Sequence, residues 1–256
     1  NFNFYNGVKL EENTAPEYSY KAVTKSQGGY LALRIPIGNR LQIYGGARVE
    51  SFYRKLSDFQ SEDSEEADII SDTLAIFPSA SLSYSFTNKM LMRLSYGQTV
   101  NRPEYREIAP YAFYDFEQSA TVYGNRDLKD SYVKNYDARF EYYPALSEMI
   151  SLGFFYKEFV NPIELNLFPA SNGWDFVAVN SLKASSYGLE VEVRKSLDFL
   201  SEGSAFGRIL KETSVSFNAS YIEGTVEKEN DYVRDKKRVL FGQSPFIVNA
   251  GLFYYN

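Results

Sequence analysis

Polar and apolar residues alternate one by one along much of this chain, and this period of two limits its fold more than any other feature. The clearest example is a pair of runs between Ser79 and Thr99, separated by Thr87-Asn88-Lys89. Side chains alternate between the two faces of a β-strand, so each run predicts a strand with one apolar and one polar face. The pair predicts a hairpin whose apolar face contacts either the core of a soluble protein or lipid.

The same alternation recurs to the end of the chain and predicts an all-β, antiparallel fold. Helical periodicity is nowhere sustained, and the best helical candidate is the linker from Leu197 to Leu210. We expect about nine strands of roughly ten residues each. Their alternating stretches lie at 31–35, 41–49, 80–86, 90–99, 132–142, 150–157, 187–194, 214–221 and 246–254.

The connections between these strands fall into two classes that alternate along the chain. Short turns lie at 37–39, 87–89 and 145–148, with an enlarged member at 198–209, and long loops lie at 56–73, 101–131, 160–180 and 225–243. Outer-membrane β-barrels have short periplasmic turns and long extracellular loops. A soluble sandwich with Greek-key connections need not sort its loops in this way.

The composition excludes several classes of function. The chain has no Cys and no His, which removes thiolate nucleophiles, Ser-His-Asp triads and the common zinc sites. A net charge of −6 argues against a nucleic-acid partner. No apolar stretch is long enough for a membrane helix. No signal peptide is visible at the start of the sequence, so we expect a mature piece or an internal fragment. We predict no enzyme, no cofactor and no metal site.

The face opposite the apolar one favours a membrane barrel over a soluble sheet. It carries small and charged residues, including Arg34, Arg48, Glu50, Arg93 and Arg139, which suit a hydrated lumen. Tyr and Phe gather towards strand ends, as interfacial aromatic girdles do. We therefore predict an up-and-down transmembrane β-barrel. The alternatives are a soluble β-sandwich that binds a ligand and a passive outer-membrane porin.

Several short segments of the sequence resemble one family of barrels. Asn101-Arg102-Pro103-Glu104-Tyr105 follows the strand ending "RLSYGQTV", and then come Gly124 to Lys129, "NYDARFEYYP", "FYKEFVNPIE" and "QSPFIVNAGLFYYN". Their order resembles the middle-to-late barrel of TonB-dependent outer-membrane receptors, particularly of the Bacteroidetes type. The resemblance covers residue 27 to the end. Arg126 and Asp130 stand where the family often has proline.

The resemblance implies active uptake of a scarce nutrient across the outer membrane of a Gram-negative bacterium. Such receptors have an N-terminal plug, a segment that engages TonB, and a barrel of 22 strands, so about nine strands imply a fragment. We expect residues 1–26 to be the remnant of an extracellular loop and 27–256 to be barrel. The cargo would be an iron chelate, cobalamin, a glycan or a peptide, the last two often with a surface lipoprotein as partner.

A small set of residues is predicted to contact the ligand. Arg102, Glu104, Tyr105 and Arg106 stand at the root of a long loop, although a salt-bridged structural role there is the favoured alternative. Trp174, the only Trp, could stack on a sugar or chelate from a loop tip, although packing within the loop or at the membrane interface is the favoured alternative. Arg93 and Arg139 are expected to face the lumen. Six carboxylates between Ser57 and Asp68 could hold Ca²⁺, but a solvated acidic loop is the favoured interpretation.

Overall fold

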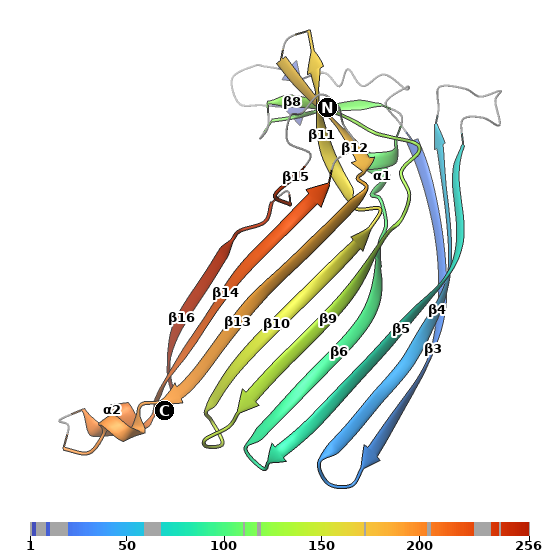
Figure 1. Cartoon of the computed structure of the whole chain (residues 1–256). Coiled ribbons are helices and arrows are strands. Elements are labelled where there is room, and N and C mark those ends of the chain that lie inside the picture. The colour runs from blue at the N-terminus through green and yellow to red at the C-terminus, as the bar shows by residue number, and fades with distance from the viewer. Residues whose placement is uncertain are drawn as a thin grey trace.

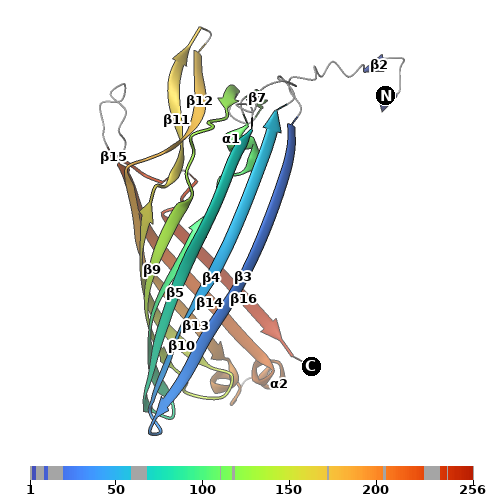
Figure 2. The ribbon, with the colours of Figure 1, turned by 90° about the vertical axis from the view of Figure 1, so that its right-hand side faces the viewer.

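The computed structural model describes residues 2–3, 9–10, 20–58, 68–109, 111–116, 119–171, 173–203, 206–227, 237–240 and 242–255. Its main element is one antiparallel sheet that curves into an open trough (Figures 1 and 2). Consecutive strands of this wall are hydrogen-bonded neighbours. They are β3 (Tyr20–Ile37), β4 (Leu41–Asp58), β5 (Ile69–Thr87), β6 (Met90–Asn101), β9 (Ser131–Tyr142), β10 (Met149–Val160), β13 (Lys183–Ser196), β14 (Thr213–Glu227) and β16 (Phe246–Tyr254).

These nine long strands confirm the predicted up-and-down arrangement. Tight turns join them at one end. Gly38 has φ 60°, a conformation that glycine adopts freely, in the turn that brings Ile37 opposite Leu41. Thr87 is opposite Met90 across Asn88-Lys89, and the Thr87 hydroxyl accepts a hydrogen bond from the Lys89 amide at 3.1 Å. Because these turns fix the register, alternate residues of neighbouring strands line up on the same face of the sheet.

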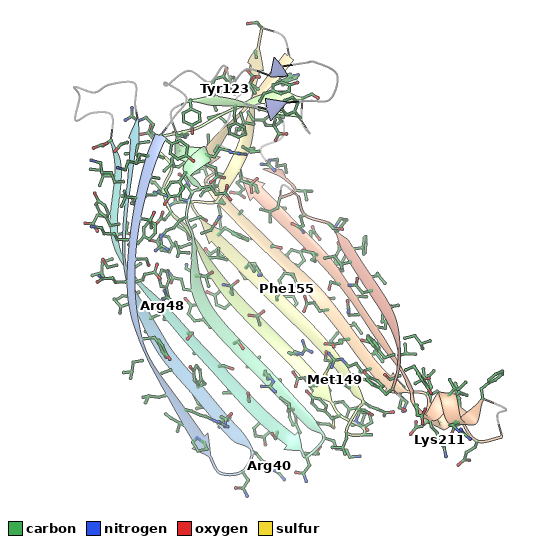
Figure 3. All side chains as sticks on the ribbon, turned by 180° about the vertical axis from the view of Figure 1, so that it is seen from behind. Arg40, Arg48, Tyr123, Met149, Phe155 and Lys211 are labelled. Carbon is green, nitrogen blue, oxygen red and sulfur yellow. The ribbon has the colours of Figure 1, made fainter. Side chains whose placement is uncertain are left out.

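The connection between β13 and β14 is the enlarged member of the short-turn end. It contains a 3₁₀ helix, η3 (Asp198–Leu200), and a short helix, α2 (Gly207–Lys211), which overlap the best helical candidate of the sequence, the linker from Leu197 to Leu210. Arg40, Met149 and Lys211 all lie at this end of the wall, and Tyr123 lies at the opposite end (Figure 3).

The opposite end contains secondary structure that the sequence did not predict. Helix α1 (Tyr105–Ile108), β7 (Ala112–Asp115) and β8 (Ala120–Tyr123) fill the predicted loop 101–131, and β11 (Ile163–Ala170) and β12 (Gly173–Asn180) fill 160–180. These four strands form a second sheet in the order β11-β12-β8-β7. The pairs β1–β2 (Phe2–Asn3 with Lys9–Leu10) and β14–β15 (β15, Lys237–Arg238) are also present. Residues 59–67 of the acidic stretch lie outside the described residues.

The wall has two chemically different faces, and the outward one is apolar. Many large apolar side chains on it are exposed, such as Leu33 at 61%, Leu152 at 53% and Leu252 at 71%. Cross-strand neighbours continue the same chemistry, because Ile43, Leu82, Leu94, Ala138, Phe154 and Leu189 follow one another in register. A contiguous apolar face of this size is typical of a surface that contacts lipid.

A row of tyrosines crosses the outward face in register. Tyr96, Tyr136, Tyr156 and Tyr187 are successive cross-strand partners on β6, β9, β10 and β13. The next row towards the long loops is polar, with Gln98, Lys134, Glu158 and Ser185 in register. From Lys134 to Tyr142, a rise of about 3.3 Å per residue and a tilt of about 40° give a height of about 20 Å, near the ~25 Å of an outer-membrane apolar band.

The compact apolar core lies at the long-loop end. It consists of Leu56, Ile108, Ala109, Leu128 and Ala178, all buried, with Tyr20 and Tyr105 packed against it. These residues come from the upper part of β4, from α1, from the segment before β9 and from β12. The core therefore fixes the long-loop region against the wall. No helix in the described part of the chain is long and apolar enough to cross a membrane.

The first long strand starts earlier than the sequence predicted. The ladder between β3 and β4 begins at Tyr20 opposite Asp58, and Gln27 is already in register with Ser51. Tyr20 to Ser26 belong to this strand. The division into an extracellular loop remnant, 1–26, and barrel, 27–256, stays a prediction.

Candidate functional site

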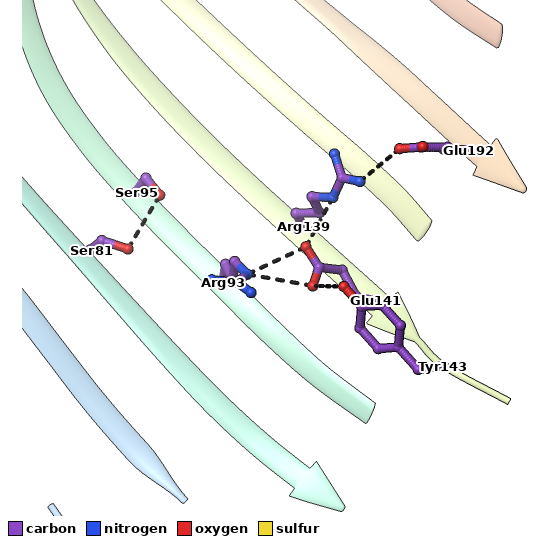
Figure 4. Close-up of polar contacts among 7 residues, drawn as sticks. All are labelled: Ser81, Arg93, Ser95, Arg139, Glu141, Tyr143 and Glu192. Atoms are coloured by element: carbon purple, nitrogen blue, oxygen red, sulfur yellow. Dashed lines mark hydrogen bonds and ion pairs between the residues drawn. The ribbon is translucent and has the colours of Figure 1, made fainter. Parts of the chain in front are cut away.

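Two of the predicted ligand residues, Arg93 and Arg139, lie on the inward face of the trough near its short-turn end (Figure 4). They are directly opposite each other on β6 and β9. Glu141 bridges them, with its Oε1 at 3.3 Å from Arg93 Nε and 3.1 Å from Arg139 Nε. The two like charges are thereby held together by one buried carboxylate, and this relieves a repulsion that would otherwise destabilise the pair.

The ion-pair chain continues across β10 to β13. Arg139 contacts Glu192 at 2.9 Å, and Glu192 contacts Arg194 at 2.8 Å. The strand between them carries Ser151 and Gly153 on this face. Because these residues are small, the long side chains of β9 and β13 can meet above β10. Tyr143 donates a hydrogen bond of 2.9 Å to Glu141 and closes the network.

The other predicted loop-root residues form a second cluster, which we call the root cluster: Arg102, Glu104, Tyr105 and Arg106. Together with Tyr20, Phe52 and Arg54 they line an open hollow of about 640 Å³. The four residues thus line one hollow, and their predicted contact with a ligand stays a prediction. The chain after β6 folds across the inward face of β4, where Arg54 donates a buried hydrogen bond of 2.7 Å to the Pro103 carbonyl.

Arg102 is held on three sides by groups of the protein itself. Its guanidinium lies 2.7 Å from Glu50 and 3.5 Å from Asp130, and it stacks 3.9 Å from the centre of the Phe52 ring. A guanidinium paired with two carboxylates and an aromatic face has little capacity left for an anionic ligand. This geometry supports the structural role that the sequence already favoured for Arg102.

The remaining members of the root cluster have local partners. Glu104 caps α1, because its amide donates to Glu107 at 2.8 Å in a capping box. Tyr105 lies 6.4 Å from the Tyr20 ring and shares a hydrogen bond with Thr24, and Arg106 stacks 4.7 Å from the Phe113 ring. Their predicted contact with a ligand stays a prediction.

Burial raises the pKa of two carboxyl groups in this region. The pKa of Asp130 is raised by burial, although the positive charges of Arg102 and Arg54 act against this increase. Burial also raises the pKa of Glu107. Both groups lie outside the membrane-spanning strands, in the segment that joins the root cluster to the second sheet.

Trp174 lies apart from the root cluster. It stands on β12 opposite Pro169 of β11, near the tip of that hairpin, and 61% of its surface is exposed. With Tyr114, Thr121 and Asp175 it lines a separate open hollow of about 660 Å³. Phe116, Tyr114 and Tyr123 are also exposed on the same sheet or beside it. The second sheet thus presents aromatic rings to the solvent at the long-loop end.

Sequence reasoning missed the partners of the predicted residues. Glu50, Phe52 and Asp130 hold Arg102, and they come from β4 and from the chain before β9. The alternation did predict that Glu50 lies on the polar face of its strand, but it made no prediction for Phe52. Nothing in the sequence indicated that the chain after β6 folds back across that face.

Nine tilted antiparallel strands, an apolar outward face with a tyrosine row and a charged inward face define the wall of an outer-membrane β-barrel. The sequence matches the family described as TonB dependent receptor-like, beta-barrel, over residues 1–256, and the chain belongs to that family. The match extends ahead of residue 27, where the resemblance began. It places the chain in the outer membrane of a Gram-negative bacterium, and the alternative of a soluble β-sandwich is wrong.

Solved structures share the fold at low sequence identity. The ferric citrate transporter FecA has a TM-score of 0.65 and 17% identity, with 92% of this chain and 31% of that chain covered. The copper transporter OprC has a TM-score of 0.64 and 14% identity, with 91% of this chain and 32% of that chain covered. The ferric-catecholate import receptor Fiu from E. coli K12 has a TM-score of 0.63 and 12% identity, with 92% of this chain and 32% of that chain covered. The chain spans about a third of the length of these relatives. No curated protein matches the sequence significantly.

Proposed function

We propose that this chain forms part of the barrel of a receptor that takes up a scarce nutrient across the outer membrane in a TonB-dependent manner. The observation that supports this most strongly is the family match over all 256 residues. TonB would act through a plug inside the barrel. The charged inward face, which includes Arg93, Arg139 and Glu192, suits contact with a hydrated protein domain of that kind. This role requires no catalytic residue.

We propose that the ligand first meets the second sheet and the root cluster. The exposed Trp174, Tyr114 and Phe116 present flat apolar rings, and such rings stack on sugars and on aromatic chelators. Glu104, Tyr105 and Arg106 line the hollow nearer the wall. Arg102, Arg93 and Arg139 would act indirectly, by holding the strands and loop roots in place.

The cargo proposed for the first test is a ferric chelate. The solved structures with the same fold are described as transporters of ferric citrate, copper and ferric catecholates. Cobalamin is a further candidate. A glycan or a peptide, with a surface lipoprotein as partner, is the alternative that follows from the resemblance to Bacteroidetes receptors.

The test uses the full-length receptor in a host strain with and without tonB. Accumulation of radiolabelled iron from a panel of ferric chelates should require both the receptor and tonB, and should stop when a protonophore collapses the proton gradient. Trp174→Ala should weaken binding of the transported chelate, whereas Leu146→Ala at the short-turn end should not. Uptake that is equal in both strains would instead indicate a passive porin and would overturn the proposal.

A further inference from the structure

The segment between β13 and β14, residues 197–212, differs from every other turn at its end of the wall. We call it the connector. The neighbouring strands are joined through 38–40, 88–89 and 143–148, whereas the connector contains η3 and α2. Figure 1 shows α2 projecting sideways from the lower ends of β13 and β14 instead of continuing along the strands. An element in this position can lie beside the barrel, where the lipid is.

Three contacts place the connector on the lipid-facing side of the wall. Lys195, which shares the outward face with Val191 and Val193, has its ammonium 5.4 Å from the ring of Phe199 in η3. The outward-facing hydroxyl of Thr213 donates to the Ile209 carbonyl at 2.6 Å. The outward-facing Tyr254 donates to Glu212 at 3.0 Å. All three anchors lie on the face that carries the apolar rows, so the connector is continuous with that face.

The connector presents several apolar side chains with large exposed fractions. Phe199 is 61% exposed, Leu200 51%, Phe206 67% and Ile209 50%. Phe206, at the N-cap of α2, and Ile209 are three residues apart and so lie near one side of the helix, and Arg208 and Lys211 share another. An amphipathic segment with apolar and cationic sides, held at the edge of a lipid-facing surface, has the composition of an interfacial helix.

We propose that the connector is a membrane-interface anchor at the short-turn end of the barrel. Phe199, Leu200, Phe206 and Ile209 would enter the boundary between headgroups and acyl chains, to a depth of about 5–10 Å as interfacial helices do. Arg208 remains exposed on α2, and its guanidinium would pair with phospholipid phosphates. The occupant of this apolar surface is the phospholipid leaflet itself. The proposal depends on the lipid-facing surface alone and goes beyond the transport function.

The test is site-directed fluorescence in proteoliposomes that contain the full-length receptor. Because the chain contains no Cys, single cysteines can be placed at Phe199, Ile209 and Glu202 in a cysteine-free background and labelled with a polarity-sensitive dye. Leu94→Cys on the lipid-facing wall serves as the lipid control, and Asn88→Cys in a tight turn as the aqueous control. Brominated phospholipids quench dyes within the bilayer, and iodide quenches dyes in water.

We expect brominated lipid to quench the dyes at 199 and 209 several-fold more than the dyes at 202 and 88, as it does at 94. Iodide should give the opposite order. The proposal is overturned if iodide quenches 199 and 209 as strongly as 88, because the connector would then be in water. It is equally overturned if neither quencher reaches them, because a protein partner or another part of the receptor would then cover the connector. The assay contains no TonB and no cargo, so its result is independent of transport.

Discussion

Leu94 and Ser95 are neighbours on β6, but their side chains lie on opposite faces of the wall. Leu94 is 41% exposed on the apolar face, whereas the Ser95 hydroxyl lies 3.5 Å from that of Ser81 on the inward face. The two faces of this strand therefore contact different environments, lipid on one side and a hydrated lumen on the other. A lipid-facing side chain can be made smaller at little cost but cannot be made charged, whereas a lumen-facing side chain can be charged. Single substitutions at these two positions can distinguish the two faces.

We predict that Leu94→Arg costs about 2–4 kcal/mol of unfolding free energy near the bilayer midplane, and that Ser95→Arg costs much less. Leu94→Ala should lose only the transfer free energy of the removed carbons, about 0.8 kcal/mol each, because acyl chains fill the space. Unfolding equilibria of the full-length receptor in lipid would measure all three values. A cost well above about 3 kcal/mol for Leu94→Ala, as in a packed core, together with an equally damaging Ser95→Arg, would contradict a lipid-facing strand.

Glu141 separates two arginines that are direct cross-strand neighbours, and its substitution tests this arrangement. Glu141→Gln removes the negative charge but keeps the shape, so Arg93 and Arg139 lose their common partner. We expect a loss of about 1.5–3 kcal/mol, the scale of a hydrogen bond to a charged group. Adding Arg93→Gln should recover part of that loss, because only one cation then remains. Unfolding equilibria of the single and double variants would measure the coupling, and an additive double variant would contradict it.

Asp130 allows a test by pH, because burial raises its folded-state pKa above the unfolded value. Below the unfolded pKa the carboxyl group is protonated in both states, and the fold keeps its full stability. As pH rises through the folded-state pKa, the buried group must ionise and this stability is lost. We expect Asp130→Asn to remove this loss, so that stability depends less on pH above about 4, the usual Asp pKa. Melting of the receptor from acid to neutral pH would measure the difference. An unchanged pH profile would show that Arg102 and Arg54 fully offset the burial.

At the scale of elements, the nine long strands could be predicted because each carries its own signal. A period of two over about five to eleven residues requires no knowledge of distant partners. The second sheet could not be predicted in this way. Strands β7 and β8 have four residues each, and β12 pairs with β8 in parallel from a distant part of the chain. Short strands that are stabilised by non-local contacts leave little local pattern.

For the candidate site, too, the sequence predicted local features but not the contacts between distant parts of the chain. Glu104, Tyr105 and Arg106 are consecutive in sequence, so their proximity was assured. Their enclosure by Tyr20, Phe52 and Arg54 depends on how the chain folds after β6, and that is set by the buried core around Leu56 and Ile108. Trp174 was predicted as part of the same ligand set, but the structure places it in a separate hollow.

A glycine pair tests how α1 and β8 fit together. A Cβ on Gly124 would lie 1.9 Å from the Ala109 carbonyl oxygen, whereas a Cβ on Gly97 would meet nothing within 4 Å. We predict that Gly124→Ala displaces the segment after α1 and costs about 1–3 kcal/mol, as overpacking does. Gly97→Ala should be neutral or slightly stabilising. Protease sensitivity of the long-loop end on intact cells would report the displacement, and equal behaviour of the two variants would contradict this packing.

At the scale of the whole molecule, the wall has a direction. Short turns and the connector lie at one end, and the core, the second sheet and the root cluster lie at the other (Figure 1). The tyrosine row and the polar row beyond it both lie on the side of the apolar band nearer the second sheet. A barrel with this asymmetry has one end adapted to present folded loops and one adapted to close strands tightly. In outer-membrane barrels these are the extracellular and the periplasmic ends.

This orientation predicts which residues can be reached from outside the cell. An epitope tag inserted at Ser171, near the tip of the β11–β12 hairpin, should be labelled by antibody on intact cells. A tag inserted at Asn88, between β5 and β6, should be labelled only after the outer membrane is permeabilised, because the apolar band separates the two ends. Heat-modifiable migration on gels would show that both tagged receptors still fold. Labelling of Asn88 but not Ser171 on intact cells would mean that the barrel is inserted the other way, and the second sheet could then not meet an extracellular ligand.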